Sequence, residues 1–203
     1  MDQVIQVLRV TGADMLPWLD HVARLRIAVF RDFPYLYDGD MAYEREYLQS
    51  LSQAAGGVLV LALDEAGAPV GASTGMPLVE AEEAIRLPFQ KANLAEDRIF
   101  YCGESVLLPA YRGQGLGHRF FDEREAHARR LPGIRTSAFA SVVRAADDPR
   151  CPADYHSNHA FWQRRGYHEH PQLRATLAWK DVGEPAQSEH ALTIWLRELE
   201  TSQ

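Results

Sequence analysis

The sequence predicts a single α+β domain that spans residues 1–203. Three observations carry this prediction. Apolar runs typical of strands alternate along the chain with segments whose apolar residues recur at helical spacing. A chain of this length can bury one substantial hydrophobic core, and it contains no internal repeats or low-complexity tracts. A glycine-rich loop also separates an apolar strand from a helix, which is typical of a ligand-binding turn.

Each element follows from its own pattern. Residues 4–10 alternate enough for a strand, whereas residues 14–30 and 40–53 place their apolar side chains on one helical face. Residues 58–63 form a continuous apolar run, as in a central strand, and a turn joins them to a hairpin partner. The remaining elements are expected at 70–76 (strand), 79–91 (acidic helical insert), 99–108 (strand), 118–130 (helix), 134–144 (strand), from 158 (short helix), 175–182 (strand) and 190–199 (strand).

Composition excludes several classes of protein. Apolar residues make up 46% and charged residues 24%, which is ordinary for a soluble globular protein. No apolar run reaches the roughly 20 residues of a membrane span, and no signal peptide is recognisable, so we expect a cytoplasmic protein. The net charge of −7 argues against a nucleic-acid partner and is compatible with a cationic amine.

Cysteines and histidines offer no further chemistry. Cys102 and Cys151 form no disulfide framework, and Cys102 lies in an apolar run where a small buried residue is expected rather than a nucleophile. The histidines at 156, 159, 168 and 170 lack cysteine or glutamate partners at zinc-binding spacing. We therefore expect no metal site.

The loop at residues 109–117 is the most informative segment. An apolar run stops at Pro109, and a loop follows with Arg112 and glycines at 113, 115 and 117. Glycine permits positive φ and close approach of a ligand, and the helix that follows aims its N-terminal N–H groups at the same point. The loop lacks the Lys-Ser/Thr of a P-loop and the spacing of a dinucleotide fingerprint. The sequence therefore predicts a cradle for a phosphate or pyrophosphate.

The pattern Arg112-x-x-Gly115-x-Gly117 resembles the acetyl-CoA-binding motif of the GNAT superfamily of N-acetyltransferases. A second segment is similar to the family's other signature, in which Asn158 and an alanine precede an aromatic pair on a short helix that ends at Gly166. The resemblance extends over most of the chain. It implies the GNAT fold, with three layers (α/β/α) and a mixed, mostly antiparallel sheet of about seven strands in which a central parallel pair is splayed.

The resemblance also implies a function. An acetyl or acyl group would pass from acetyl-CoA to a primary amine of a small molecule or a protein. The alternative is an acyl-CoA-binding sensor or interaction domain with little turnover. The sequence is compatible with a homodimer. The residues that the resemblance assigns to acetyl-CoA are Ser105, Val106, Leu107, Leu108, Arg112, Gly113, Gln114, Gly115, Leu116, Gly117, Asn158, Phe161 and Trp162.

Two residues are candidates for proton transfer. Glu104 is the only carboxylate in its apolar strand, and a base there would take a proton from the amine. An equally open interpretation is that Glu104 faces a buried arginine, caps a loop, or orders a water without taking a proton. In many relatives the second residue of the aromatic pair is a tyrosine whose hydroxyl meets the CoA sulfur and acts as the acid. This chain has Trp162 at that position. Tyr155 is the first choice to replace that acid, with His156, His159 and solvent as alternatives.

Two loops are candidates for the acceptor site. Phe33, Tyr35 and Tyr37 lie between the first two helices, and Asp147 and Asp148 lie in a long proline-bearing connection. Aromatic rings and carboxylates suit an organic ammonium group. A packed aromatic loop with solvated acids is the other interpretation.

Overall fold

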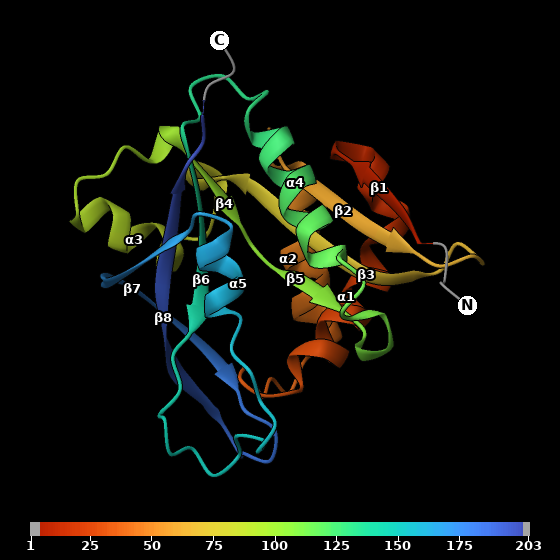
Figure 1. Ribbon diagram of the computed structural model, residues 1–203, viewed down its shortest axis with the longest axis vertical. Coiled ribbons are helices and arrows are strands. Elements are labelled where there is room, and N and C mark those ends of the chain that lie inside the picture. The colour runs from red at the N-terminus through yellow and green to blue at the C-terminus, as the bar shows by residue number, and fades with distance from the viewer. Residues whose placement is uncertain (1–4, 201–203) are drawn as a thin grey trace.

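The computed structural model describes residues 5–200. Its strands form one sheet in the order β1-β2-β3-β4-β6-β8-β7, with β5 paired to β3 beside this path (Figure 1). Among the strand pairs within residues 5–200, only β4–β6 is parallel. The strands are β1 (Gln6–Val10), β2 (Val58–Leu63), β3 (Pro69–Pro77), β4 (Ile99–Cys102), β5 (Ser105–Leu107), β6 (Thr136–Val142), β7 (His168–Lys180) and β8 (Gln187–Glu198).

Helices cover both faces of this sheet (Figure 1). The α-helices are α1 (Leu19–Phe30), α2 (Met41–Gln53), α3 (Glu83–Lys91), α4 (Leu116–Ala128) and α5 (His159–Arg164). Short 3-10 helices cover Gly12–Trp18, Leu78–Glu80, Glu96–Arg98 and Pro109–Tyr111. The predicted three-layer α+β fold, with its mostly antiparallel sheet and one central parallel pair, is confirmed.

The alternation of side chains along the strands divides the core into layers. On β2, Val58 and Val60 pack with the α4 and α5 side, whereas Leu59 and Leu61 pack under α1 and α2. A third cluster joins α3 to β4, β6, β7 and β8. Along β4, Phe100 and Cys102 belong to the α4 cluster, whereas the side chain between them, Tyr101, belongs to the third cluster. The third cluster therefore lies on the sheet face opposite α4. This is the face that α1 and α2 cover, so α3 covers it too.

Several predicted elements have other bounds in the structure. The helix predicted over 14–30 begins as a 3-10 helix, and α1 starts only at Leu19, because Pro17 cannot donate to a helical ladder. The strand predicted from 175 begins earlier, at His168, and passes an irregularity between His170 and Arg174 that contains Pro171. The first residue of the strand predicted over 4–10 lies outside the described residues.

The strand predicted over 99–108 is split into β4 and β5. Gly103 separates them, and a Cβ there would lie 2.7 Å from both the Thr74 Oγ1 and the Tyr47 hydroxyl, so glycine permits this close approach. The irregularity is held by the Glu104 carbonyl oxygen, which accepts from Thr74 N and from Arg124 Nη1, both at 3.0 Å.

This break opens the centre of the sheet. Parallel pairing between β4 and β6 covers Ile99–Cys102 and Thr136–Phe139 and then stops. Beyond it β5 pairs only with β3, and residues 140–142 of β6 pair only with β8. Two strand edges therefore face each other without pairing, which confirms the splayed central pair.

Candidate active site

The glycine loop forms an open cradle of backbone N–H groups. Gly113 and Gly115 adopt φ of +78° and +77°, and a Cβ on either would meet nothing within 4 Å. Gly115 directly precedes α4. Within the described chain, the N–H groups of residues 113–118 donate to no protein acceptor. Unpaired amides at a helix N-terminus suit a phosphate or pyrophosphate, as the sequence predicts.

The edge of β5 carries further unpaired groups. Thr74 N bonds to the Glu104 carbonyl and Leu108 N to the Val70 carbonyl, so positions 104, 106 and 108 face β3. By alternation, the backbone groups of Ser105 and Leu107 face the opening. Arg112 Nε donates to the Leu107 carbonyl at 3.1 Å, so this side chain organises the loop. The N–H groups of Ser105 and Leu107 remain available to an extended ligand.

The short helix α5 packs beside this opening. The Phe161 ring lies 4.8 Å from the His118 ring, and its Cζ would lie 3.5 Å from a Cβ on Gly117; both residues are at the start of α4. The Trp162 ring packs against Phe139 and Trp195, with centroids 4.9 and 5.1 Å away. Trp162 therefore fills the core between α5 and the sheet.

Asn158, the first residue of this signature, precedes α5, but its side chain makes no capping hydrogen bond.

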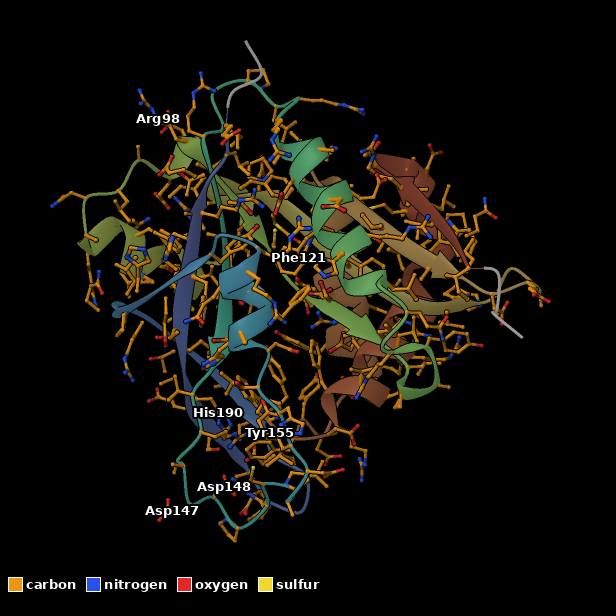
Figure 2. All side chains as sticks on the ribbon, viewed as in Figure 1. Arg98, Phe121, Asp147, Asp148, Tyr155 and His190 are labelled. Atoms are coloured by element: carbon orange, nitrogen blue, oxygen red, sulfur yellow. The ribbon has the colours of Figure 1, made fainter. Side chains whose placement is uncertain are left out.

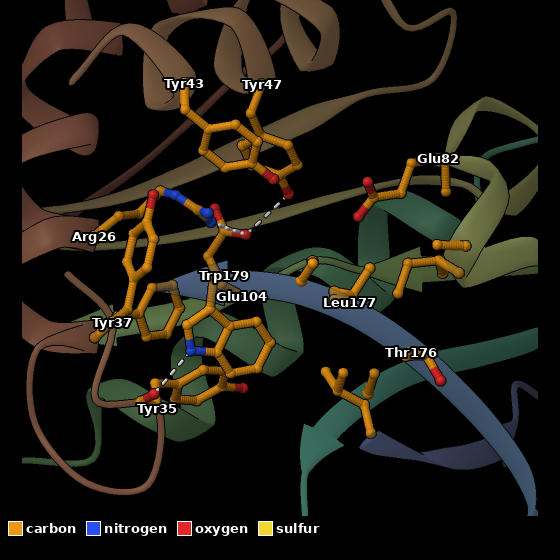
Figure 3. Close-up of a pocket in the computed structure, with 18 of the residues that line it drawn as sticks. Arg26, Tyr35, Tyr37, Tyr43, Tyr47, Glu82, Glu104, Thr176, Leu177 and Trp179 are labelled. Carbon is orange, nitrogen blue, oxygen red and sulfur yellow. Dashed lines mark hydrogen bonds and ion pairs between the residues drawn. The ribbon is translucent and has the colours of Figure 1, made fainter. Parts of the chain in front are cut away.

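A pocket of about 560 Å³ lies on the opposite face of the sheet, between α2, α3 and β7 (Figure 3). Gly103, Glu104 and Ala140 line it and mark the place where β4 and β6 separate, so the pocket reaches the splayed strands. Seven aromatic side chains line other parts of its wall. They are Phe30, Tyr35, Tyr37, Tyr43, Tyr47, Tyr101 and Trp179.

Glu104 is part of a buried charge cluster at this pocket. Arg26 forms ion pairs with Glu104 and with Glu44, which lies on α2. The Tyr47 hydroxyl donates to Oε2 of Glu104 at 3.0 Å (Figure 3). Burial alone would lower the pKa of Arg26, but the adjacent carboxylates outweigh it and raise that pKa well above its usual value. The buried arginine that the sequence analysis left open as a partner of Glu104 is therefore present, and the role of Glu104 as a base stays a prediction.

Glu82 is another carboxylate that faces the pocket (Figure 3). It directly precedes α3 and, in the described part of the chain, has no ion-pair or side-chain hydrogen-bond partner. Desolvation raises its pKa, and the charge of Arg26 opposes that shift. Glu82 is not among the residues predicted from the sequence, although the acidic insert that carries it is predicted.

The aromatic residues predicted for the acceptor site divide into two groups. Tyr35 and Tyr37 line the pocket, and the Tyr35 carbonyl accepts from Trp179 Nε1 at 3.0 Å. Phe33 does not line it, but packs edge-on against Tyr155 with ring centroids 4.8 Å apart. Tyr155 is also outside the pocket wall, and desolvation raises its pKa. The role of Tyr155 as an acid stays a prediction.

Asp147 and Asp148 lie at one end of the molecule (Figure 2), and neither lines the pocket. The Asp148 carboxylate bonds to the side chain and backbone N–H of Arg150, which lowers its pKa to about 2. The geometry gives these two residues no contact with a ligand in the pocket. Their assignment to acceptor binding stays a prediction that the structure does not favour.

The described residues contain neither a cluster of metal ligands nor a membrane-spanning helix. No group of three or more metal-ligating side chains gathers within residues 5–200. None of the helices described there is long and apolar enough to span a membrane.

Comparison with known proteins supports the interpretation of this geometry. A search of curated proteins returned no match. Solved structures share the fold at low identity. A protein from Acinetobacter baylyi classed as an acetyltransferase is 12% identical with a TM-score of 0.64, over 98% of this chain and 94% of that one. Arabidopsis thaliana NAA60 in complex with acetyl-CoA is 15% identical with a TM-score of 0.60, over 97% and 100%.

A phosphinothricin acetyltransferase from Sinorhizobium meliloti, also in complex with acetyl-CoA, is 16% identical with a TM-score of 0.56, over 98% of this chain and 89% of that one. The sequence model of the Acetyltransferase (GNAT) family matches residues 22–167, well over half of the chain. With the splayed strands and the open amide cradle, this match identifies the chain as a member of the GNAT acetyltransferase family.

Proposed function

We propose that this protein transfers an acetyl group from acetyl-CoA to a primary amine bound in the aromatic pocket. The observation that carries the proposal is the meeting of two sites at the splayed strands. The amide cradle and the edge of β5 lie toward α4, and the pocket lies toward α2 and α3. Both end where β4 and β6 separate. A thioester held along β5 would meet an amine held in the pocket.

The cofactor contacts follow from the unpaired backbone groups. The amides of residues 113–118 would hold the pyrophosphate, and the N–H groups of Ser105 and Leu107 would pair with the amide groups of pantetheine. A Cβ at 113 or 115 would project into open space in front of the loop, so these glycines leave room for a ligand. Backbone donors near the thioester carbonyl would also stabilise the oxyanion as it develops.

The charge of the pocket favours a cationic acceptor. Among its lining residues, Glu82, Glu104, Asp38 and Asp40 are acidic, whereas the described basic ones are Arg26 and Lys180. Lys180 is already paired with Asp38 at 2.9 Å. An ammonium group that enters the pocket would meet carboxylates and the faces of tyrosine rings, and both attract cations.

The proposal is tested by thiol release from acetyl-CoA with a panel of amines. The panel contains alkylamines, arylalkylamines, diamines and a lysine-containing peptide, with mass spectrometry of the acetylated product. We expect release with at least one primary amine and none with its tertiary analogue, which cannot yield a stable amide. Tight acetyl-CoA binding without release for any amine would favour the sensor alternative. Absence of acetyl-CoA binding would contradict both functions.

A further inference from the structure

The carboxylate of Glu104 is poorly placed to meet an amine directly. Its Oε1 is shut away from solvent without a hydrogen-bond partner, and its Oε2 is taken by Arg26 and Tyr47. Tyr47 is only partly buried and also lines the pocket. A ligand in the pocket therefore reaches the Tyr47 hydroxyl more easily than the carboxylate behind it.

The Tyr47 hydroxyl also lies at the point where the strands separate. A Cβ on Gly103 would meet this hydroxyl at 2.7 Å, which places Oη against the backbone between β4 and β5. The Arg26 guanidinium packs over the Tyr47 ring, 4.4 Å from the ring centroid. These contacts keep the hydroxyl beside the position that the proposed function gives to the thioester.

The cluster behind Tyr47 has a surplus negative charge. Two carboxylates, Glu44 and Glu104, share the single guanidinium of Arg26, so the fully ionised cluster carries a net charge of −1 in a buried environment. Buried surplus charge is costly, and uptake of one proton removes it. Arg124, on α4, donates to the Glu104 carbonyl oxygen and not to its carboxylate.

The other titratable groups around the cluster provide no second cation for these carboxylates. They are Tyr35 and Tyr37 from the loop after α1, Tyr43 from α2, Glu82 from the insert and Tyr101 from β4. Desolvation and the charge of Glu104 raise the pKa of Tyr47 well above its usual value, so this side chain stays neutral. A neutral hydroxyl can pass on a proton without itself becoming charged.

We propose that Tyr47 is a catalytic residue that relays a proton from the acceptor ammonium to the buried Glu44–Arg26–Glu104 cluster. This inference rests on the proposed function. The ammonium gives a proton to the Tyr47 oxygen while the Tyr47 proton moves to Glu104 Oε2, so the tyrosine ends neutral and the cluster ends uncharged. The amine lone pair then forms the C–N bond as the C–S bond breaks. The second proton of the attacking nitrogen balances the one that the thiolate gains, and the cluster later returns its proton to solvent.

The test compares Tyr47→Phe with Tyr167→Phe. Tyr167 is a matched control because its hydroxyl also donates to a buried glutamate, Glu125 at 3.2 Å, and it does not line the pocket. At neutral pH and saturating acetyl-CoA, we expect Tyr47→Phe to lower kcat about 10²-fold. Its acetyl-CoA Kd, measured by calorimetry, should stay within about twofold of the wild type. Tyr167→Phe should keep the wild-type kcat.

The pH profile separates a relay from a structural role. Above the pKa of the acceptor, the amine enters without its extra proton, and the kcat deficit of Tyr47→Phe should shrink toward the wild-type value. A deficit that is constant with pH, or a neutral-pH kcat within about threefold of the wild type, would overturn the relay while leaving acetyl transfer intact. A wild-type protein that acetylates no amine would instead contradict the proposed function, and the relay with it.

A second variant tests the cluster. Glu44→Gln keeps the shape of the side chain but leaves a cluster that is already neutral, so uptake of a proton would create a buried net charge of +1. We expect a kcat loss comparable to that of Tyr47→Phe, with normal acetyl-CoA binding. Wild-type turnover in a folded Glu44→Gln protein would contradict the cluster as the proton acceptor.

Discussion

Glu104 combines two roles at one position of the chain. Its carbonyl oxygen holds the irregularity between β4 and β5 through bonds from Thr74 N and Arg124 Nη1. Its carboxylate lies beside Arg26 and Tyr47 at the pocket. A side-chain substitution removes the charge but leaves the backbone bonds. The fold at the splayed strands and the chemistry of the pocket can therefore be tested separately.

We expect Glu104→Gln to lower kcat by about 10²-fold or more while acetyl-CoA binding is unchanged, because a glutamine cannot take the proton of the amine. The amide oxygen can still accept from Tyr47, so the fold should persist. The measurement is a pH–rate profile of wild type and variant at saturating acetyl-CoA. An unchanged profile would remove Glu104 from the mechanism.

The cradle can be tested at Gly115. Valine there must adopt a φ of +77°, which costs roughly 1–3 kcal/mol of backbone strain, and its side chain projects into the space in front of the loop. We expect acetyl-CoA to raise the melting temperature of the wild type, and we expect Gly115→Val to abolish that rise. Gly183→Val is the matched control, because Gly183 has a φ of +87° and equally open surroundings in a distant turn. Normal acetyl-CoA binding by Gly115→Val would refute the cradle assignment.

At the scale of elements, the insert between β3 and β4 determines the shape of the pocket. Ile85 and Phe89 of α3 pack against Leu173 and Ala175 of β7, so the helix is fixed over the edge of the sheet. This packing positions Glu82, directly before α3, at the pocket. The element therefore contributes a negative charge to the wall of the pocket.

We expect Glu82→Gln to raise the KM of a cationic acceptor by about tenfold, the effect of losing roughly 1.4 kcal/mol of attraction, with little change for acetyl-CoA. Glu83→Gln is the control, because Glu83 is adjacent in sequence but does not line the pocket. The measurement is steady-state kinetics with both substrates varied. Equal KM values for the two variants would show that the Glu82 charge does not select the acceptor.

Elements with a strong local pattern could be predicted from the sequence. The strand at 58–63 and the helix after Asp40 were predicted correctly, since one is a continuous apolar run and the other has a side-chain N-cap at Asp40. The break at Gly103 could not be predicted, because the apolar run around it has the pattern of one uninterrupted strand. The break depends on contacts with Thr74 and Tyr47, which are distant in sequence.

The site could be predicted only in part. The glycine loop has a local signature, whereas the pocket assembles from α2, α3, β7 and the loop after α1. The sequence does contain one signal of the buried charge cluster. Arg26 falls on the apolar face of α1, one turn after Val22, and Glu44 on that of α2, one turn before Leu48. Charged residues on buried faces of two adjacent helices indicate a buried pair.

At the scale of the whole molecule, Asp181 joins segments that are far apart in sequence. It accepts from Arg144, which follows β6, and from Arg150 in the next loop (Figure 2 shows this end of the molecule). Arg144 also donates to the carbonyl oxygens of Pro34 and Tyr35 at 2.6 and 2.7 Å. Through Arg144 and Arg150, the buried Asp181 carboxylate thereby connects the loop after α1 with the loop after β6.

The stability that this carboxylate contributes should depend on pH. Desolvation would raise the pKa of Asp181, but the hydrogen bonds from Arg144 and Arg150 outweigh it and lower that pKa. A lowered carboxylate pKa stabilises the fold above the unfolded value of about 3.9, and the stabilisation is lost as pH falls below it. We expect Asp181→Asn to cost about 3–5 kcal/mol at neutral pH, since it leaves Arg144 buried without its counter-charge.

The measurement for Asp181→Asn is the free energy of unfolding by urea between pH 7 and pH 2. The difference from wild type should narrow as the pH falls below about 4, where the wild-type carboxylate also loses its charge. Asp147→Asn is the control, because Asp147 is an exposed aspartate in the loop that carries Arg144 and Arg150. A pH-independent difference would assign the effect to packing rather than to charge.

The opening between β4 and β6 also constrains the order of events in a catalytic cycle. The cradle lies on the α4 face of the sheet and the pocket on the face of α2 and α3, so neither ligand blocks the route of the other. The nearest thiol, Cys102, is 1% exposed and burial raises its pKa, so it is unsuited to carry the acetyl group between half-reactions. Both substrates should therefore be bound together before any product leaves. Double-reciprocal plots should intersect to the left of the ordinate, whereas parallel lines and a protein mass raised by one acetyl group would indicate a covalent intermediate.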